Sequence, residues 1–325
     1  MIESKEKTIL VTGGTGSFGK HFVSHLLKNH AFKKIIIFSR DELKQYHIQK
    51  EFSDSRLRFF LGDVRDLQRL HRAFSGVDIV VHAAALKQVP ALEYNPVEAI
   101  QTNIIGTQNV IDAAIDEGVG NVVLISTDKA AYPVNLYGST KLCAEKLCVA
   151  ANSYAGGKTK FSVVRYGNVF GSRGSIVETI LKNKQSDVIH ITHEDMTRFW
   201  ITLDQACDLV LFALSEMVGG EIFVPKIPSM KLVDLVTAMA PHMRREIIGI
   251  RPGEKMHETL LTDQEARHVV AFDKYYVILP EFPFWSDTEY DKYHARGTRM
   301  PPGFSYASHT NTEWLAPGDI LHLVA

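Results

Sequence analysis

The chain has 325 residues, of which 45% are hydrophobic and 22% charged, so it is long enough for two domains or one large α/β unit. Lysine and arginine total 36 against 37 for aspartate and glutamate, and the formal net charge of -1 favours neither nucleic acid nor an anionic membrane as a partner. The three cysteines, Cys143, Cys148 and Cys207, lack the spacing of a disulfide framework or a zinc site, which indicates a reducing, cytoplasmic setting. The polar start and the lack of a long uncharged apolar stretch predict neither export nor a membrane span.

Apolar runs rich in valine and isoleucine alternate with helical patterns through the first half of the chain. Continuous apolar runs suit strands that are buried on both faces of a parallel sheet, and the connections between such strands are right-handed. The pattern therefore predicts an α/β fold with a Rossmann-like, doubly wound parallel sheet. The predicted strands are residues 8–12, 34–39, 57–61, 79–82, 121–126 and 160–166.

Two helical segments have a clear apolar face. In the helix after the first strand, that face is formed by Phe18, Phe22 and Leu26. A longer helix begins at Asn95 and Pro96, because asparagine caps helices well and proline suits the first helical position. We expect this helix to end near residues 117–118 and to turn one face to the core, formed by Ile100, Ile104, Ile111 and Ile115.

Glycine and proline punctuate shorter elements after residue 166, where a smaller C-terminal region begins. We interpret residues 1–166 as a domain that binds NADP and residues 167–325 mainly as a substrate domain. Residues 196–220 include a helical pattern around 202–215, and we expect this segment to pack back onto the first sheet.

A glycine-rich turn, with Gly13, Gly16 and Gly19, connects the first strand to the first helix. Glycine permits the tight turn and lets the backbone approach a pyrophosphate, whose charge is stabilised by the free N–H groups of the helix N-terminus. A plain strand-to-helix turn is the alternative, but the position and spacing favour dinucleotide binding. The predicted contacts here are Gly13, Thr15, Gly16, Ser17, Phe18 and Gly19.

The end of the second strand bears on the choice between NAD and NADP. An enzyme that uses NAD is expected to place a carboxylate there against the ribose 2′-hydroxyl, whereas this chain has Ser39 and Arg40. Arginine can bind a 2′-phosphate and stack on adenine, so we predict NADP, although Asp41 is an adjacent carboxylate and a solvated Arg40 is the alternative. Asp63 either accepts from the adenine amino group or caps a helix. The predicted cofactor contacts at this end are Ser39, Arg40, Asp41, Lys44, Asp63, Val64 and Ala83.

The densest cluster of reactive side chains is Ser126-Thr127-Asp128-Lys129, followed by Tyr137 and Lys141. The spacing of four puts Tyr137 and Lys141 on one helix face, where the ammonium can lower the pKa of the phenol and reach the nicotinamide ribose. A phenolate near a substrate hydroxyl is the base that is needed when hydride leaves the same carbon. Such a pair also occurs on amphipathic surface helices, but the preceding Ser-Thr at a strand end favours catalysis.

The glycine-rich turn, Thr127 and the Tyr137-x-x-x-Lys141 motif resemble those of extended short-chain dehydrogenases/reductases. The segments HAAALKQVP from His82, STDKAAYPVNLY from Ser126, EIFVPKIPSM and RPGEK narrow the resemblance to the inverting UDP-N-acetylglucosamine 4,6-dehydratases of pseudaminic acid synthesis. The resemblance spans nearly the whole chain and implies a tightly held NADP that is reduced and reoxidised in each turnover. The implied product is a UDP-4-keto-6-deoxy sugar of L-arabino configuration, used for flagellin or other surface glycans. It also implies a homo-oligomer, either a dimer or a hexamer.

The resemblance assigns catalytic roles to Thr127, Asp128, Lys129, Tyr137 and Lys141. Asp128 is the acid toward O6 and Lys129 the base at C5, which requires a protonated aspartate and a neutral lysine in a buried, coupled site. A loop ion pair is the alternative interpretation of these two residues. A retaining dehydratase would have Asp-Glu here, so Lys129 favours inversion, with the final proton delivered to the opposite face of C5 through Tyr137 or water.

For the UDP-sugar, the resemblance implies contacts from a further set of residues, in which arginine forks would match phosphate oxygens. Taken individually, each arginine is better interpreted as a solvated surface residue, and the set gains its support from the whole-chain resemblance. Tyr132 departs from the family, which usually has a small polar residue such as asparagine there. The implied substrate contacts are Lys87, Asn168, Arg173, Ser175, Val177, Arg198 and Arg251.

Two other functions stay open. A UDP-hexosamine 4-epimerase would use Thr127, Tyr137 and Lys141 without needing Asp128 and Lys129, and an inactive NADP-binding scaffold or sensor would need none of the five. UDP-N-acetylgalactosamine also stays open as a substrate.

We predict no metal site, because His21 and His25 have no evident carboxylate nearby and are interpreted as structural or solvent-facing. Cys143 and Cys148 are expected to pack as small apolar groups. The aromatic residues Phe282, Phe284 and Trp285 are assigned to the C-terminal core or an intersubunit surface.

Overall fold

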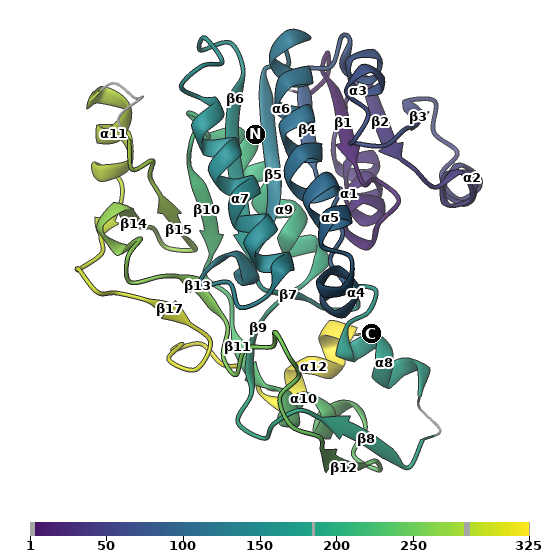
Figure 1. Cartoon of the computed structure of the whole chain (residues 1–325), viewed down its shortest axis with the longest axis vertical. Coiled ribbons are helices and arrows are strands. Elements are labelled where there is room, and N and C mark those ends of the chain that lie inside the picture. Colours follow the sequence, from purple (N-terminus) through teal and green to yellow (C-terminus); the bar gives the residue numbers. More distant parts are fainter. Residues whose placement is uncertain (1–3, 184–185, 283–286, 325) are drawn as a thin grey trace.

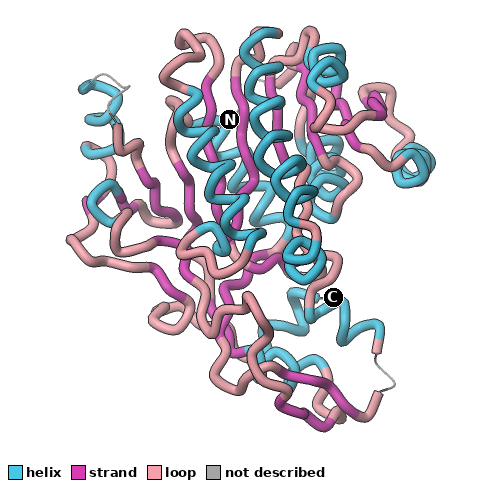
Figure 2. The backbone as a smooth tube through the Cα atoms, viewed as in Figure 1, coloured by secondary structure: helices cyan, strands magenta, loops and turns pink. Residues whose placement is uncertain are grey.

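The computed structural model describes residues 4–183, 186–282 and 287–324, and its largest element is a ten-stranded sheet (Figures 1 and 2). The strand order is β16-β14-β15-β10-β6-β5-β4-β1-β2-β3, and all neighbours from β3 to β10 are parallel. The six strands from β3 to β6 have the 3-2-1-4-5-6 order of dinucleotide-binding sheets, which confirms the predicted fold class. Their bounds are β1 Thr8–Thr12, β2 Lys34–Ser39, β3 Leu57–Leu61, β4 Ile79–His82, β5 Asn121–Thr127 and β6 Lys160–Tyr166.

The far edge of the sheet is extended by one more parallel strand and three antiparallel ones, with β15 beside β10, and β14 between β15 and β16. These four strands belong to the C-terminal half of the chain, so both halves of the chain contribute strands to one sheet. The bounds are β10 Ile222–Pro225, β14 Val269–Ala271, β15 Tyr275–Ile278 and β16 Thr298–Arg299.

Helices cover both faces of the sheet (Figures 1 and 2). In the view of Figure 1, α6 and α7 lie in front of the sheet, and α1 and α9 lie behind it. Helix α9 begins at a capping box formed by Thr202 and Gln205 and packs against α1, β5 and β6. The helix bounds are α1 Ser17–Asn29, α2 Glu42–Glu51, α3 Leu67–Phe74, α6 Gly106–Asp116, α7 Leu136–Ala151 and α9 Leu203–Glu216.

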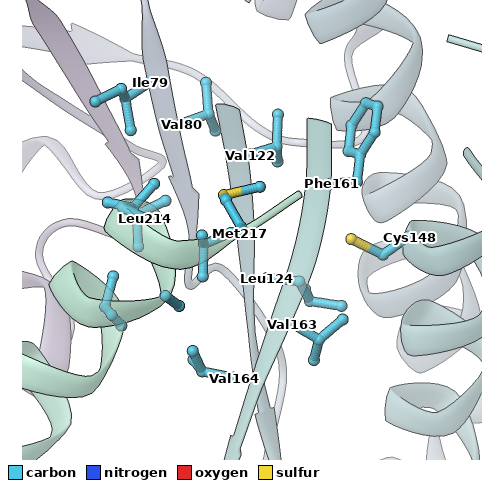
Figure 3. Packing of buried hydrophobic residues seen from close by; sticks show 14 of the residues in the cluster. Ile79, Val80, Val122, Leu124, Cys148, Phe161, Val163, Val164, Leu214 and Met217 are labelled. Carbon is cyan, nitrogen blue, oxygen red and sulfur yellow. The ribbon is translucent and has the colours of Figure 1, made fainter. Parts of the chain in front are cut away.

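The main hydrophobic core fills both sides of the sheet. Figure 3 shows side chains of β4, β5 and β6 near Leu214 and Met217 at the end of the α9 segment, with Cys148 of α7 nearby. Cys148 is buried as predicted, whereas Cys143 is exposed, so its predicted packing is wrong. Phe282 is 72% exposed, which excludes it from the core, and Phe284 and Trp285 lie outside the described residues.

The long helix predicted from residue 95 is interrupted. After α4 (Val89–Tyr94) and α5 (Pro96–Ala99), a π-helical turn η1 (Ile100–Ile105) precedes α6. The wider turn rotates the buried face, so Ile100 is 39% exposed and Ile104 is only partly buried, contrary to the predicted core face. Asn103 is buried instead, and its amide bonds the backbone of Leu86 and the hydroxyl of Thr140, which fastens the segment after β4 to α7.

A smaller lobe lies below the carboxyl ends of the parallel strands in the view of Figure 1. It has its own core, which includes Phe170, Val177, Trp200 and Met230. Its elements are β7 Asn168–Val169, α8 Ile176–Lys182, β8 Val188–Ile191, β9 Thr197–Ile201, β11 Ser229–Lys231, α10 Leu232–Met239, β12 Arg244–Ile247 and α12 Pro317–Val324. The remaining elements are β13 Thr259–Leu261, which pairs with β17 Tyr306–Ala307, the short helix η3 Ala266–His268, and α11 Asp287–His294, whose Tyr293 bonds Glu216 and Glu221 beside the main sheet.

Carboxylates of α9 lie against the histidines of α1, which corrects the expectation that none is nearby. The Nε2 atom of His21 lies 2.6 Å from Oδ1 of Asp204, and Nε2 of His25 lies 3.7 Å from Oδ1 of Asp208. Among the described residues, no group of three or more histidine, cysteine or acidic side chains is arranged to hold a metal ion. The contact joins two helices whose proximity the linear sequence does not reveal.

His82, at the end of β4, is buried beneath the glycine-rich turn. Its Nδ1 lies 2.7 Å from Oγ1 of Thr12, and its Nε2 lies 3.1 Å from Oγ1 of Thr107, so one ring joins β1, β4 and α6. The same Thr12 hydroxyl accepts a hydrogen bond from the backbone N–H of Ala84. Burial, reinforced by the charge of Lys141, lowers the pKa of His82 to about 3.

We expect His82 to make folding sensitive to mild acid. In the unfolded chain the ring titrates near 6.5, so between there and pH about 3 the unfolded state binds more protons. As the pH is lowered through this window, His82 should therefore reduce the free energy of unfolding by about 1.4 kcal/mol for each pH unit. In His82→Gln, denaturant unfolding should give lower stability at neutral pH but a flatter pH dependence; the exposed His47→Gln is the control. Equal slopes in the wild type and His82→Gln would contradict this account.

Candidate active site

Two adjoining cavities follow the carboxyl ends of the parallel strands, where ligands bind in open α/β sheets. The first, of about 520 Å³, and the second, of about 450 Å³, share Gly13, Gly16, Ala83 and Ala85 in their walls. Every residue predicted to contact the cofactor lines one of them. The first cavity is lined by Gly13, Thr15, Gly16, Ser39, Arg40, Asp41, Lys44, Asp63, Val64 and Ala83. The second adds Ser17, Phe18, Gly19, Tyr137 and Lys141.

The glycine-rich turn forms the wall between the two cavities. Gly13 has a φ of +66°, and a Cβ there would lie 2.8 Å from the backbone nitrogen of Ala84. A Cβ on Gly19 would lie 2.5 Å from the carbonyl oxygen of Gly13, so α1 can pack onto the turn only through glycine. Gly16 precedes α1 without a side-chain cap, which leaves the first N–H groups of the helix for an anion. The turn therefore fits the pyrophosphate of a dinucleotide.

The outer end of the first cavity carries the residues that bear on cofactor choice. Arg40 is half exposed, and its guanidinium lies 3.4 Å from the carboxylate of Asp63. Asp41 caps α2 by accepting from the backbone N–H of Lys44, and it also pairs with the Lys44 ammonium, so this carboxylate is engaged within its own helix. Asp63 accepts from the backbone and side chain of Arg65, while the cap of α3 is Asp66. Two cations, Arg40 and Lys44, therefore stand at this end.

Asp128 and Lys129 begin a short 3-10 helix, η2 (Asp128–Ala130), at the end of β5. Oδ1 of Asp128 accepts from the Thr127 hydroxyl at 2.9 Å and from Nζ of Lys129 at 3.0 Å. The Asp128 side chain is fully buried, and its Oδ2 has no hydrogen-bond partner in the part of the chain that the structure describes. Burial raises the pKa of Asp128, although the Lys129 charge opposes this, so the carboxyl is shifted toward the acid form.

Lys129 lines the second cavity as a charged ammonium. Burial alone would favour the neutral amine, but the carboxylates of Asp128 and Glu258 outweigh it and raise the pKa of Lys129. The expected neutral lysine is therefore not the resting form. Asp128 contributes most to this rise, and Glu258, a carboxylate with no signal in the sequence, adds to it.

Tyr137 and Lys141 lie one turn apart on α7, which Asn135 caps by accepting from the backbone N–H of Gly138. Burial lowers the pKa of Lys141 to about 8. Burial also raises the pKa of Tyr137 to about 12, and the cation that opposes this rise is Lys129. This corrects the expectation that Lys141 lowers the pKa of the phenol. The cation that lowers it is Lys129, which follows β5.

Glu258 reaches the cluster from the C-terminal part of the chain and is only 2% exposed. Its Oε1 lies 3.4 Å from Nζ of Lys129 and 3.8 Å from Nε of Arg198, and its Oε2 lies 3.4 Å from Nζ of Lys255. The nearest sequence signal is the RPGEK segment, which stops at Lys255. A single carboxylate three residues further on has no spacing pattern that would mark it.

The predicted substrate contacts divide into two groups. Lys87, Asn168, Arg173 and Ser175 line the second cavity. Oδ1 of Asn168 is buried and has no hydrogen-bond partner within residues 4–183, 186–282 and 287–324, as expected of an amide that receives a ligand.

The other three predicted substrate residues lie outside the walls of both cavities. Val177 is fully buried in the core of the smaller lobe, and Arg251 lies on an exposed loop. The guanidinium of Arg198 is buried and donates to the backbone carbonyls of Thr197, Met256 and Lys255. Arg198 therefore serves the packing of this lobe and the Glu258 cluster.

The surroundings of Tyr132 show what a tyrosine contributes at the position where the family usually has a small polar residue. Tyr132 has a φ of +48°, the left-handed region in which asparagine is tolerated better than an aromatic residue. Its hydroxyl donates to the carboxylate of Asp263, which ties the loop after η2 to the segment after β13. Tyr132 therefore has an unfavourable backbone conformation, but its hydroxyl connects the loop after η2 to the segment after β13.

Comparisons with known proteins agree with this geometry. A relative from Campylobacter jejuni, named UDP-N-acetylglucosamine 4,6-dehydratase (inverting), is 49% identical over 324 residues, which cover 98% of this chain and 97% of the relative. A relative from Rickettsia conorii, named UDP-glucose 4-epimerase, is 41% identical over 98% of this chain and 95% of its own length.

Among solved structures, Pen from Bacillus thuringiensis is 37% identical with a TM-score of 0.88, over 99% of this chain and 98% of its own. The dTDP-glucose 4,6-dehydratase of Streptomyces venezuelae, solved with NAD and TYD bound, is 25% identical with a TM-score of 0.69, over 77% of this chain and 86% of its own. In the described part of this chain, no helix combines the length and apolar character needed to cross a membrane. The family model described as "Polysaccharide biosynthesis protein" matches residues 9–280, and the chain belongs to this family of extended short-chain dehydrogenases/reductases.

Proposed function

We propose that this protein is an inverting UDP-N-acetylglucosamine 4,6-dehydratase. The observation that carries the proposal is the pairing of two reactive sets in one site: Tyr137 and Lys141 on α7, and Asp128 hydrogen-bonded to Lys129 at the end of β5. An epimerase needs only the first set. The 49% identity to the Campylobacter jejuni relative supports the same assignment over nearly the whole chain.

The first set supports oxidation of C4. A nicotinamide dinucleotide held by the glycine-rich turn, Tyr137 and Lys141 would supply the hydride acceptor for C4 and the hydride donor for C6. Tyr137 is the base for the C4 hydroxyl and must first lose its own proton, since burial raises its pKa to about 12 and the charge of Lys129 only partly opposes this rise. The buried Lys141, whose pKa is lowered to about 8, lies one helical turn away, where it would bind the nicotinamide ribose. Thr127, whose hydroxyl donates to Asp128, lies beside the same cavity and orients the acid.

The second set supports elimination of water. Once C4 is a ketone, the C5 proton is acidic: Lys129 removes it, the electron pair forms the C5–C6 double bond, and the C6–O6 bond breaks as Asp128 protonates O6. Moving one proton along the 3.0 Å hydrogen bond from Lys129 to Asp128 produces both species that this step requires. Displacing water from the cavity favours that neutral pair over the ion pair, because charges lose solvation.

Solution NMR of the wild-type protein in deuterated water with UDP-N-acetylglucosamine and NADP tests the proposal. We expect a 6-methyl signal, deuterium at C5 and the couplings of the L-arabino configuration. The D-xylo configuration would instead indicate a retaining dehydratase.

A sugar changed only at C4 would contradict dehydration and favour the epimerase, which the Rickettsia relative supports as the second candidate. A parallel reaction with UDP-N-acetylgalactosamine determines which hexosamine is preferred. No change of either sugar would reject both functions and leave the inactive NADP-binding protein.

We also propose NADP as the cofactor. The support is the half-exposed Arg40 with Lys44 at the outer end of the first cavity, and the engagement of Asp41 with α2. In Arg40→Met, the dissociation constant for NADP should rise by about 10- to 100-fold, because a charged hydrogen bond to phosphate is lost, while that for NAD changes little. Fluorescence titration measures both constants, with Arg58→Met, outside the cavity, as control. Equal weakening of NAD and NADP would contradict a 2′-phosphate contact.

The remaining parts of the proposal concern the setting of the enzyme. All three cysteines are free, which suits a reducing cytoplasm. A 4-keto-6-deoxy aminosugar nucleotide is a precursor for pseudaminic acid and for glycans such as those on flagellin, and we propose this destination on the family resemblance. A homo-oligomer, either a dimer or a hexamer, is proposed on the same ground.

A further inference from the structure

Glu258 has no role in the mechanism above, yet it is a buried carboxylate in contact with the candidate base. Its Oε1 lies 3.4 Å from Nζ of Lys129, the atom that also donates to Asp128 at 3.0 Å. Glu258 does not line either cavity, so it reaches the substrate only through Lys129.

The backbone around Glu258 is held rigidly. Its N–H donates to the hydroxyl of Ser308 at 2.9 Å, and its carbonyl accepts from the N–H of Ser308 at 2.8 Å. The Ser308 hydroxyl also lies 2.7 Å from that of Thr197 in β9. The backbone that carries the carboxylate is therefore held between the ends of β9, β13 and β17.

The charges around Glu258 keep it ionised. Burial would raise its pKa, but Lys129, Arg198 and Lys255 together lower it. Its Oε2 has no hydrogen-bond partner among the residues that the structure describes, and the nearest cation to that oxygen is Lys255 at 3.4 Å. A buried carboxylate with a free lone pair and a cation on either side acts mainly through its charge.

We propose that Glu258 is a positioning residue for Lys129, which orients the nitrogen toward C5 and stabilises the ammonium that forms there when the proton is removed. This inference rests on the proposed dehydratase function. During the step, the C5–H bond breaks, its electrons pass into the conjugated C4 ketone, and the lone pair of Lys129 forms the new N–H bond. The step starts from the neutral pair of Asp128 and Lys129 that substrate binding favours. Relative to that pair, positive charge grows on a nitrogen that already faces the fixed carboxylate, so the interaction with Glu258 is stronger in the transition state.

The test is Glu258→Gln, which keeps the shape and removes the charge. We expect kcat for methyl formation to fall by about 100-fold with KM nearly unchanged, because Glu258 touches no substrate. Oxidation of C4 does not use Lys129, so the absorbance of the reduced nicotinamide should accumulate during a turnover. The acidic limb of the pH profile of kcat should move to lower pH, since Lys129 loses its proton more readily when Asp128 is the only remaining carboxyl group that contacts it among the described residues.

Two further variants separate charge from shape. Glu258→Asp retains the charge and should recover part of kcat and the wild-type pH limb; it also carries the test if Glu258→Gln does not fold. Glu254→Gln removes a carboxylate that contacts Arg198 but not Lys129, and should leave the elimination step unchanged. In a Lys129→Met background, Glu258→Gln should have no further effect on the residual rate.

The inference is overturned if Glu258→Gln has wild-type kcat and pH profile. It is also overturned if cofactor reduction and methyl formation fall in parallel with thermal stability, since that is a structural role. The proposed function fails separately: in that case the wild-type protein itself forms no 6-methyl product.

Discussion

The cost of burying charge at the end of β5 governs the site. Asp128 is fully buried and Glu258 nearly so, and two carboxylates removed from water need cations and hydrogen bonds to remain there. Lys129, Arg198 and Lys255 provide the positive charge, and they come from both parts of the chain. The cluster exists only where the parallel sheet meets the smaller lobe, so the fold and the candidate chemistry depend on the same contact.

A second buried network holds α7 in place beside this cluster. Arg165 of β6 pairs with Glu145 of α7 and with Glu265, which follows β13, and Ser126 of β5 donates to Glu145. This links two central strands, the helix that carries Tyr137 and the C-terminal part of the chain. Since each charged group is paired, the network secures the position of the helix without adding a free charge near the cavity.

Much of the fold was readable from the sequence because its signals are local. Parallel strands buried on both faces give continuous apolar runs, and the glycine-rich turn has a fixed place between the first strand and the first helix. The π-helical turn at residues 100–105 could not be read in this way, since its register is set by Asn103 bonding Leu86 and Thr140. Tertiary contacts there override the helical periodicity of the isoleucines.

In the candidate site, too, the residues with local sequence signals could be predicted, and the one that only tertiary contact brings in could not. Asp128, Lys129, Tyr137 and Lys141 are close in the chain and share motifs, whereas Glu258 lies far along the sequence and is brought to Lys129 only by folding. The protonation states also depend in part on that contact: Asp128 contributes most of the charge that raises the pKa of Lys129, and Glu258 adds to it. Arg198, which the family resemblance implies contacts the UDP-sugar, is a cation of the buried cluster, and the linear sequence gives no sign of this contact.

The central claim is that one set of residues oxidises the sugar and another removes water. A single-turnover comparison of Lys129→Ala and Tyr137→Phe with UDP-N-acetylglucosamine, following the absorbance of the reduced cofactor and the release of 6-deoxy sugar, tests it most directly. The account predicts that Lys129→Ala reduces the cofactor and stops there, while Tyr137→Phe fails to reduce it. Release of 6-deoxy sugar by Lys129→Ala at the wild-type rate, or loss of cofactor reduction in both variants, would contradict the claim.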